Sequence, residues 1–375
     1  MSSIPARSGA RTDAAILDAI RRSPDTTRVA IARDLGVTAA TVTNSVKRLI
    51  ADGLVLESGR ARSTGGKPAS LLRVSTTSRW AVGCTVESDR LSLVAMGVTG
   101  ALRGRVMLPL GHLDEARLAE PLRAALTELG ALDPAQRTAF TGIGIADLRG
   151  HGLGVEELGA AVRELTGAPV VIGTAAVCAG LGSAWVGEQD PERPCLTVHL
   201  GPTIGVALLR DGRPLLPATG GPGELDHVAA GPDGTPLHEI ASPAADVRRA
   251  LDQGLGAELG LDPAGERVLT DHARLTEAAG HGDERAAAVV TASARAIAGA
   301  VAGIAGPLGI ERVVLSGTSV SMAPRIYREA FAGVLRSRTG ALPPGLEVAV
   351  STVQPHPCSV GAAALALTSA LSPEA

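Results

Sequence analysis

The stretch that decides the N-terminal fold is Thr27-Arg-Val-Ala-Ile-Ala-Arg-Asp-Leu-Gly-Val-Thr-Ala-Ala-Thr-Val-Thr-Asn-Ser-Val-Lys47. It contains two segments of helical pattern that are separated by a glycine. The first segment ends at Leu35, and Gly36 can adopt the positive φ that a sharp helix ending requires. Thr38 then offers a side-chain oxygen as the N-cap of a helix that continues to about Asp52. Two helices joined by a short glycine turn predict a helix-turn-helix.

Apolar residues recur at helical spacing on both sides of this turn and also upstream of it. The upstream helix, residues 12–23, is broken by Pro24. The predicted inward-facing residues of the three helices are Ala15, Ile16, Ala19 and Ile20, then Val29, Ala32 and Leu35, then Val42, Val46, Leu49 and Ile50. Two short strands around a glycine-rich basic loop follow Gly53, so the pattern predicts a winged module.

The exposed face of the third helix carries short polar and basic side chains, which suit base edges and phosphates in a DNA major groove. The basic loop can contact phosphates or a narrow minor groove. The candidate DNA-binding residues are Thr38, Thr41, Thr43, Asn44, Lys47, Arg60, Arg62 and Lys67. A small three-helix interaction domain with a solvated charged loop is the alternative interpretation.

The charge distribution favours a nucleic-acid partner for this head. Residues 1–74 hold 12 Lys+Arg against 6 Asp+Glu, a local net charge of +6, although the whole chain has a net charge of −3. A basic head on an acidic body predicts that contact with DNA is confined to the N-terminus.

Cysteine spacing and hydropathy bear on the compartment. The four cysteines, Cys84, Cys178, Cys195 and Cys358, are too scattered for a disulfide frame or a zinc cage. The N-terminus shows no charged-then-apolar leader, and we expect no bilayer-spanning run. These features predict a cytoplasmic protein without a membrane partner.

The periodicity changes from Trp80 onward. Groups of strands followed by alternating helices and strands occur twice, which predicts an α/β body of two mixed lobes with a cleft between them. The predicted domains are 1–76 for the winged head, 77–190 for the first lobe and 191–358 for the second lobe, with a C-terminal helix, 359–375, packing back on the first lobe. Helices are expected over 243–259 and 283–305, and the latter is a candidate subunit interface.

Three motifs follow one another in the second lobe: Val198-His-Leu-Gly-Pro-Thr-Ile-Gly-Val-Ala-Leu208, Asp211-Gly212 and Gly220-Gly-Pro-Gly-Glu-Leu-Asp-His227. Together with the winged head and its Gly-Gly-Lys-Pro loop, they make the chain resemble the ROK family of repressors and sugar kinases. The resemblance implies an actin-like fold of two ribonuclease-H-like lobes. It also implies a phosphate loop at Gly201, Thr203 and Gly205 and a sugar-binding element at Glu224 and His227.

The kinase chemistry of the family is missing at two positions. The family's Asn-Asp pair, whose Asp is the base for the sugar hydroxyl, aligns with Thr174-Ala175, and no carboxylate occurs between Glu164 and Glu188. Loss of a positioned base costs about 10²–10⁴ in rate. The acid of the first phosphate loop aligns with Thr85. We therefore expect no enzyme activity, with Ala175 in place of the catalytic carboxylate, and no cofactor.

Ligand binding is harder to assign. Glu224 and His227 either bind the hydroxyls of a ligand or are structural residues, and the glycines around Thr203 also suit a simple hairpin. Because residues 229–242 contain no cysteine, His227 has no partners for a zinc site, and no metal is expected.

No nucleophilic site is predicted either. The segment Gly317-Thr-Ser-Val-Ser321 lacks the closing glycine of a nucleophile elbow. No Ser-His-Asp arrangement is predicted, and no role is assigned to His112, His199, His272 and His281.

The leading hypothesis is a ROK-type transcriptional regulator, a repressor, that binds a double-stranded DNA operator. A homodimer or homotetramer is expected, because one winged head reads only a few base pairs. A sugar-like effector in the cleft is expected to shift the spacing of the heads. Two alternatives stay open: a sugar kinase with a DNA-binding head, and a DNA-binding scaffold that responds to no ligand.

Overall fold

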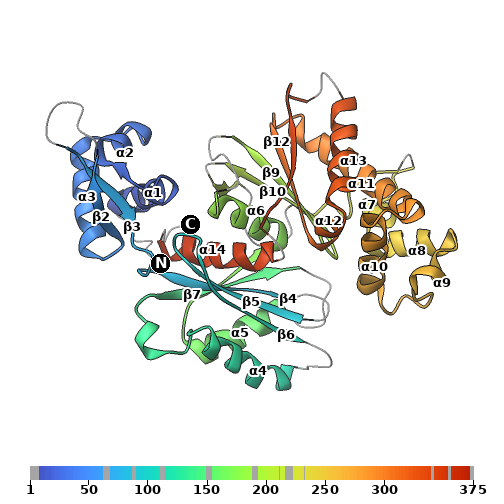
Figure 1. Cartoon of the computed structure of the whole chain (residues 1–375), viewed down its shortest axis with the longest axis horizontal. Coiled ribbons are helices and arrows are strands. Elements are labelled where there is room, and N and C mark those ends of the chain that lie inside the picture. The colour runs from blue at the N-terminus through green and yellow to red at the C-terminus, as the bar shows by residue number, and fades with distance from the viewer. Residues whose placement is uncertain are drawn as a thin grey trace, which may run out of the picture.

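The computed structural model describes residues 8–61, 68–86, 90–109, 115–148, 154–187, 193–210, 212–215, 223–231, 233–338, 342–353 and 356–371. It forms three bodies, each built around one sheet (Figure 1). A small head lies beside the first lobe. A cleft separates the first lobe from the second. The domain boundaries near residues 76 and 190 stay a proposal.

The head is a three-helix unit with a three-stranded sheet in the order β1-β3-β2. Its elements are α1 (Ser8–Arg22), β1 (Thr26–Thr27), α2 (Arg28–Asp34), α3 (Ala39–Ala51), β2 (Val55–Arg60) and β3 (Ser70–Val74). Gly36 has φ 64°, and the Thr38 side chain accepts a hydrogen bond from the Thr41 amide at 3.1 Å. The glycine turn and the threonine cap therefore occur where the sequence predicts them.

Three predicted inward-facing residues of the head point outward instead. Val29 is 72% exposed, while Leu35 and Ile50 are each 36% exposed. Ile31 is the buried residue of α2. A helix as short as α2 buries one narrow stripe, and the helical period alone does not specify which residue faces the core.

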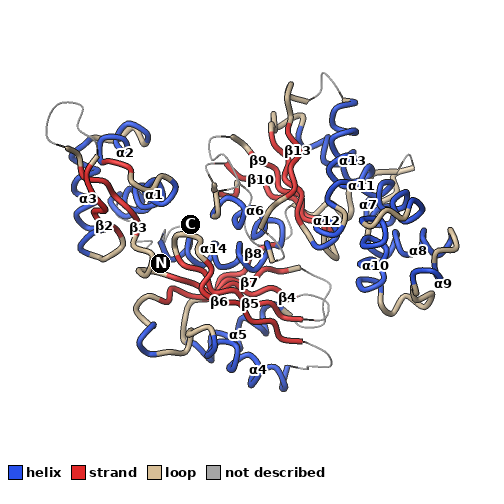
Figure 2. Tube along the Cα trace, in the orientation of Figure 1, coloured by secondary structure: helices blue, strands red, loops and turns tan. Residues whose placement is uncertain are grey.

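Lobe one is a five-stranded sheet in the order β6-β5-β4-β7-β8, in which β4, β7 and β8 are parallel. Its elements are β4 (Trp80–Val86), β5 (Arg90–Gly97), β6 (Leu102–Pro109), α4 (Glu115–Glu128), a 3₁₀ turn (Pro134–Gln136), β7 (Phe140–Asp147), α5 (Val155–Thr166), β8 (Val170–Thr174) and α6 (Ala175–Trp185). Helices α4 and α5 cover one face, and the C-terminal helix α14 (Pro357–Leu371) covers the other (Figure 2).

Lobe two repeats this plan with the sheet order β11-β10-β9-β12-β13. Its strands are β9 (Cys195–Leu200), β10 (Ile204–Arg210), β11 (Arg213–Pro214), β12 (Arg312–Ser316) and β13 (Glu347–Val350). Its helices are α7 (Leu237–Ala241), α8 (Pro243–Asp252), α9 (Gly256–Leu259), α10 (Val268–Gly280), α11 (Glu284–Ala305), α12 (Thr318–Met322) and α13 (Pro324–Ser337).

One expectation for these helices is wrong, and one helix was not predicted. The helix expected over 243–259 is divided into α8 and α9, because Gly254 adopts φ 76° between them. Helix α10, which the sequence analysis did not predict, packs against α8 and α11. Because α10 contributes His272 to the cleft, a residue of the cavity could not be placed from the sequence.

Helix α11 is the central helix of lobe two. Its Val289, Val290, Ile297 and Val301 are buried in the main apolar cluster of that lobe. By length and composition alone α11 could cross a membrane, which the sequence analysis did not anticipate, and 44% of its most apolar window is buried within the fold. Core helices of globular domains commonly meet the same criterion.

Helices α6 and α14 cross each other between the lobes at very close range. A Cβ atom added to Gly361 of α14 would lie 1.5 Å from the Cys178 carbonyl oxygen of α6. Added Cβ atoms at Gly83 and Gly144 would each lie 1.8 Å from a carbonyl oxygen of α14. Glycine at these positions lets α14 lie directly on the sheet, which brings the start of α14 to the cleft.

The head packs on the body through a shared apolar cluster, and one arginine of α1 adds a polar contact. Arg21 donates a hydrogen bond to the Trp185 carbonyl at 2.9 Å, and its guanidinium lies 4.1 Å from the centroid of a Trp185 ring. Asp18 pairs with Arg21 at 2.9 Å. Burial lowers the pKa of Arg21, and the nearby Asp18 charge opposes that effect. Because Trp185 ends α6, this contact joins the head to the helix pair between the lobes.

We expect Arg21→Ala to loosen the head. A cation–π contact of this kind contributes about 0.5–2 kcal/mol, and the charge-assisted hydrogen bond contributes further. Hydrogen exchange in α1 should therefore become faster, while exchange in α11 should be unchanged. Unchanged protection of α1 in the variant would show that apolar contacts alone hold the head in place.

Candidate functional site

The face of α3 is the candidate DNA-binding surface, and its five predicted residues differ in their surroundings. Asn44 and Lys47 are exposed. Thr38 and Thr41 share a hydroxyl hydrogen bond of 2.8 Å at the cap, and Thr43 donates to the Ala39 carbonyl at 2.8 Å. The threonine hydroxyls thus stabilise the helix start, and Asn44 and Lys47 are the side chains best presented to a partner.

The wing is described only in part. Arg60 is exposed at the end of β2, whereas Arg62 and Lys67 lie outside the described residues. Arg73 of β3 pairs with Asp25, which also accepts a hydrogen bond from Ser58 at 2.7 Å. The Arg73 and Ser58 hydrogen bonds lower the pKa of Asp25. This contact fixes the two wing strands to the turn after α1.

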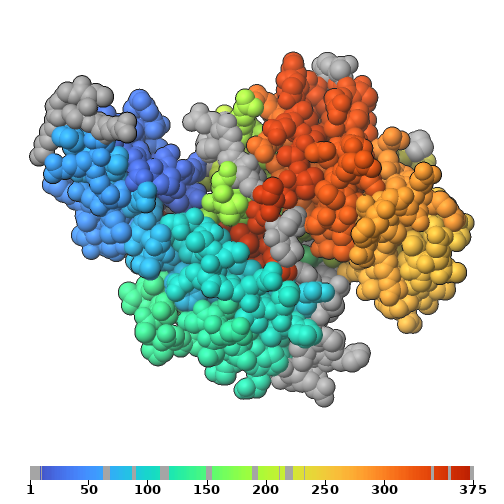
Figure 3. Space-filling view, viewed as in Figure 1, coloured from blue at the N-terminus to red at the C-terminus, as the bar shows by residue number. Residues whose placement is uncertain are grey.

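Helix α3 is also joined to α1 by an ion pair. Arg48 donates two hydrogen bonds to Asp13 of α1, at 2.9 and 2.6 Å. Arg48 has no predicted role, because a contact with a residue 35 positions away leaves no local pattern in the sequence. Val42, Val46 and Leu49 of α3 face the core, so Asn44 and Lys47 face away from it, on the head that Figure 3 shows projecting beside lobe one.

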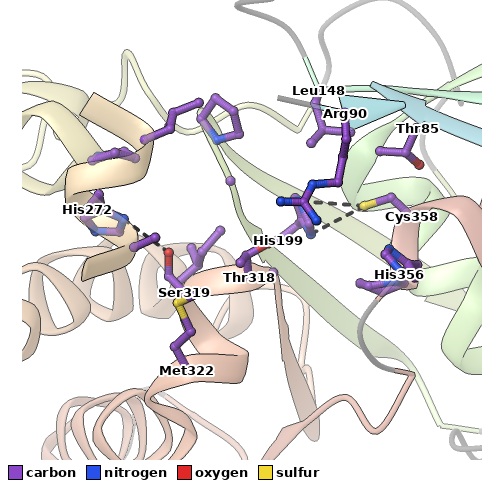
Figure 4. A pocket seen from close by; sticks show the side chains of 18 of the residues that line it. Thr85, Arg90, Leu148, His199, His272, Thr318, Ser319, Met322, His356 and Cys358 are labelled. Carbon is purple, nitrogen blue, oxygen red and sulfur yellow. Dashed lines mark hydrogen bonds between the residues drawn. The ribbon is translucent and has the colours of Figure 1, made fainter. Parts of the chain in front are cut away.

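A cavity of about 280 Å³ lies between the two lobes (Figure 4). Lobe one, with the start of α14, and lobe two form opposite walls. The polar side chains of the lining are Thr85, Arg90, His199, Thr270, His272, Thr318, Ser319, His356, Cys358 and Ser359. No carboxylate occurs among the described residues that line it.

A chain of hydrogen bonds runs from the core of lobe two to the cavity wall. Asp246, which is 2% exposed, faces His272 Nε2 at 3.2 Å, and His272 Nδ1 lies 3.3 Å from Ser319 Oγ. Ser293 also donates to Asp246, and Arg249 pairs with it at 2.9 Å. The arrangement holds the His272 ring and the Ser319 hydroxyl at the cavity.

The sequence predicts no Ser-His-Asp arrangement, yet the fold brings these three side chains together. Its three members come from α8, α10 and α12, so no local motif announces it. Gly317, two residues before the serine, has φ 120°, and a Cβ there would lie 2.1 Å from the Leu200 carbonyl oxygen. The close approach of β12 to β9 therefore requires glycine, which places Ser319 at the cleft.

Cys358 and His199 form a second pair at the cavity. Cys358 Sγ donates to the Ala175 carbonyl at 3.5 Å and lies 3.7 Å from His199 Nε2. The other three cysteines do not line this cavity, and burial raises the pKa of each of their thiols to about 12. Cys358 is the cysteine placed to meet a ligand.

The predicted ligand residues are only partly at this cavity. Gly201 lines it, whereas Thr203, Gly205, Glu224 and His227 are not among its lining residues. Glu224 forms a β-bridge with Gly205, and the ring centroids of His227 and His238 lie 5.2 Å apart in a T-shaped arrangement. Their role in ligand binding stays a prediction.

The position predicted to align with the base of the family's kinases lies at a helix start. Thr174 caps α6 by accepting a hydrogen bond from the Val177 amide at 3.3 Å, and Ala175 is 8% exposed. Thr85 accepts a hydrogen bond from Ser359 at 2.9 Å. Asp147 at the end of β7 lies opposite Thr174 in the strand register. A carboxylate therefore lies beside the aligned position, although not among the residues that line the cavity.

Among the residues that the structure describes, no group of three or more His, Cys, Asp or Glu side chains could hold a metal ion.

The fold and these sites define a class, a winged DNA-binding head on a kinase-like body. A model of the winged helix-turn-helix DNA-binding domain matches residues 10–55, and the model of the ROK family matches residues 151–369. The chain belongs to the ROK family and carries an N-terminal winged helix-turn-helix.

Solved structures agree with this fold. A ROK family transcriptional regulator, a homologue of the E. coli Mlc protein, superposes with a TM-score of 0.72 at 18% identity, over 97% of this chain and 98% of its own. A ROK hexokinase from Thermus thermophilus superposes with a TM-score of 0.58 at 22% identity, over 76% of this chain and 97% of its own. The first similarity includes the head, and the second is confined to about three quarters of the chain.

Curated relatives match over a shorter range. A putative xylose repressor from Caldicellulosiruptor sp. is 25% identical over 219 residues, 54% of each protein. An uncharacterized protein from Sinorhizobium fredii is 25% identical over 214 residues, 53% of this chain and 55% of its own. The chain spans about half the length of the curated relatives it matches.

Proposed function

We propose that the protein is a DNA-binding transcriptional regulator, a repressor, whose kinase-like body senses a small molecule. The observation that carries the proposal is the winged head with Asn44 and Lys47 exposed on α3, joined to a ROK body. The similarity to a putative xylose repressor supports repression and a sugar-like effector. We also propose that the protein acts in the cytoplasm.

Helix α3 would enter the major groove of the operator. An asparagine can form two hydrogen bonds with adenine, and a lysine can contact guanine or a phosphate. The wing with Arg60, Arg62 and Lys67 would contact the flanking backbone. The hydroxyls of Thr38, Thr41 and Thr43 would hold the first turn of α3 against the phosphates of the operator. A homodimer or homotetramer would place two heads on successive half-sites.

The kinase-like body would bind a small molecule without catalysing phosphoryl transfer to it. Ala175 stands where the kinases of the family have their base, and a reaction without that base is slower by about 10²–10⁴. The described lining of the cavity holds no carboxylate that could replace it. No cofactor is proposed.

A sugar kinase is the second candidate, and Asp147 is the observation in its favour. Its register opposite Thr174 brings a carboxylate near the aligned base position. Turnover of ATP with a hexose that Asp147→Asn abolishes would establish the kinase. The third candidate, a scaffold that responds to no ligand, fits poorly with a cleft lined by arginine, histidine and hydroxyl groups.

The deciding experiment is binding of the wild-type protein to DNA from its own upstream region across a salt series. A regulator should bind that DNA at least about 10³-fold more tightly than unrelated DNA, with affinity that falls steeply as salt rises. Equal affinity for both DNAs at every salt concentration would contradict the proposal for this operator.

A further inference from the structure

We propose that Asp25 is the positioning residue of the wing: its carboxylate holds strands β2 and β3 in the orientation that brings Arg60 to the DNA backbone. The inference rests on the proposed DNA-binding function and deepens it, because it names a residue that sets a DNA contact through other residues. Asp25 is not among the candidate residues predicted from the sequence.

The Asp25 carboxylate joins both wing strands. Its Oδ1 accepts hydrogen bonds from Ser58 Oγ of β2 and from Arg73 Nε of β3, each at 2.7 Å. Arg73 Nη2 donates to the other oxygen, so the arginine binds the carboxylate through two parallel hydrogen bonds. The Asp25 amide also donates to the Leu72 carbonyl of β3 at 3.0 Å. One residue of the turn after α1 therefore holds β2 and β3 together.

The backbone at Asp25 is unusual. Asp25 has φ 64°, and no other residue except glycine has a positive φ in the part of the chain that the structure describes. Aspartate and asparagine tolerate this left-handed conformation better than most residues. Such a backbone costs free energy that the surrounding contacts must offset. The turn keeps this conformation at the place where the carboxylate meets both strands.

Strand β2 is irregular where Asp25 contacts it. The register of β2 with β3 shifts between Glu57 and Gly59, and Ser58 falls at that point. An irregularity of this kind bends and twists its strand and so redirects the end of the strand. Arg60 is two residues beyond Ser58, where β2 ends. The hydrogen bond from Ser58 to Asp25 therefore fixes the bend that gives Arg60 its direction.

A second ion pair joins β2 to the helix-turn-helix. Arg28, the first residue of α2, donates a hydrogen bond to Glu57 at 2.8 Å. Thr27 caps the same helix by accepting a hydrogen bond from the Ala30 amide at 3.2 Å. The four residues from Asp25 to Arg28 thus connect the wing strands to the start of α2. This segment sets the direction of the wing relative to α3.

These contacts orient the wing more than they stabilise the fold. The side chains of Asp25 and Arg73 are 36% and 56% exposed. Ion pairs between exposed side chains contribute little to the free energy of unfolding. Loss of the carboxylate should therefore leave the head folded and change the wing alone.

The test is a double-mutant cycle of operator affinity, measured by fluorescence anisotropy with upstream DNA. Asp25→Asn keeps a residue that tolerates the left-handed backbone and removes the charge, and it should weaken binding by about three- to tenfold. Arg60→Ala should weaken binding by a similar factor in the wild type. In the Asp25→Asn background it should weaken binding by less than about twofold, because the wing is already displaced. Lys47→Ala should have the same effect in both backgrounds.

Two further variants and a measurement without DNA complete the test. Asp25→Gly allows the positive φ, removes the whole side chain and should repeat the result of Asp25→Asn. Asp34→Asn is the matched control, since it removes an exposed carboxylate that pairs with the adjacent Arg33. It should leave affinity unchanged or slightly higher, because negative charge opposes DNA binding. Amide hydrogen exchange in Asp25→Asn should be faster in β2 and β3 and unchanged in α3.

Three results would overturn the inference. The first is an affinity of both Asp25 variants equal to or above that of the wild type. The second is an Arg60→Ala effect that is absent in the wild type or equal in both backgrounds. The third is loss of the Lys47→Ala effect together with that of Arg60→Ala, which would indicate a disrupted head. Any of these in a protein that prefers its operator would refute this inference alone. A wild type without operator preference would contradict the proposed function and this inference with it.

Discussion

Replacing Asn44 and Lys47 together by alanine is expected to reduce operator affinity by at least about thirtyfold, because each contact of this kind contributes about 1–3 kcal/mol. Both side chains are exposed on α3, so the free energy of unfolding should change by less than about 0.5 kcal/mol. The loss of a lysine–phosphate contact should also reduce the dependence of log affinity on log salt by about 1 for each head.

Fluorescence anisotropy with a labelled upstream DNA fragment across a salt series measures the affinity and its salt dependence, and urea unfolding measures the free energy of unfolding. Arg325→Ala is the matched control, since it removes a charge from an exposed side chain on α13 in lobe two. The control should retain wild-type affinity. Full affinity in the Asn44/Lys47 variant would show that α3 is not the recognition helix and would favour the interaction-domain interpretation of the head.

Replacing Gly361 by alanine is expected to destabilise the protein by at least about 3 kcal/mol or to prevent folding. The added Cβ would lie 1.5 Å from the Cys178 carbonyl oxygen, and both groups belong to helix backbones that cannot move apart without separating α14 from α6. Since α14 brings Cys358 to the cavity, any folded fraction should also bind cleft ligands weakly.

Gly303→Ala is the matched control for this substitution. Gly303 lies within α11, and an added Cβ there meets nothing within 4 Å. Alanine should stabilise the helix by about 0.5–1 kcal/mol. Urea unfolding of the two variants and the wild type measures both effects. Equal midpoints for Gly361→Ala and wild type would show that the helices tolerate a wider separation.

The head shows which features a local sequence pattern can predict. The Gly36 turn and the Thr38 cap involve residues a few positions apart, so the sequence displays them directly. Inward and outward faces are less certain, as Ile50 and Val29 show, because the neighbours that bury a residue come from other elements. The contact of Arg48 with Asp13 depends on the packing of α1 against α3 and has no local signal.

The cavity illustrates the opposite case. Its histidines lie at positions 199, 272 and 356, and its arginine lies at position 90. Helix α10 escaped prediction, and His272 therefore had no element to place it. The motif-based residues Glu224 and His227 are not among the residues that line the cavity. A ligand site assembled from two lobes is created by long-range packing, which residue spacing does not encode in a readable form.

The sequence by itself therefore determined the winged head, the order of two α/β lobes and the family, because capping, periodicity and short motifs act over a few residues. The tertiary structure alone decided how α6 and α14 meet, how the head joins Trp185, and which side chains face the cleft. The physical reason is that these features depend on contacts between segments more than a hundred residues apart, whose geometry is set by close packing of the whole core.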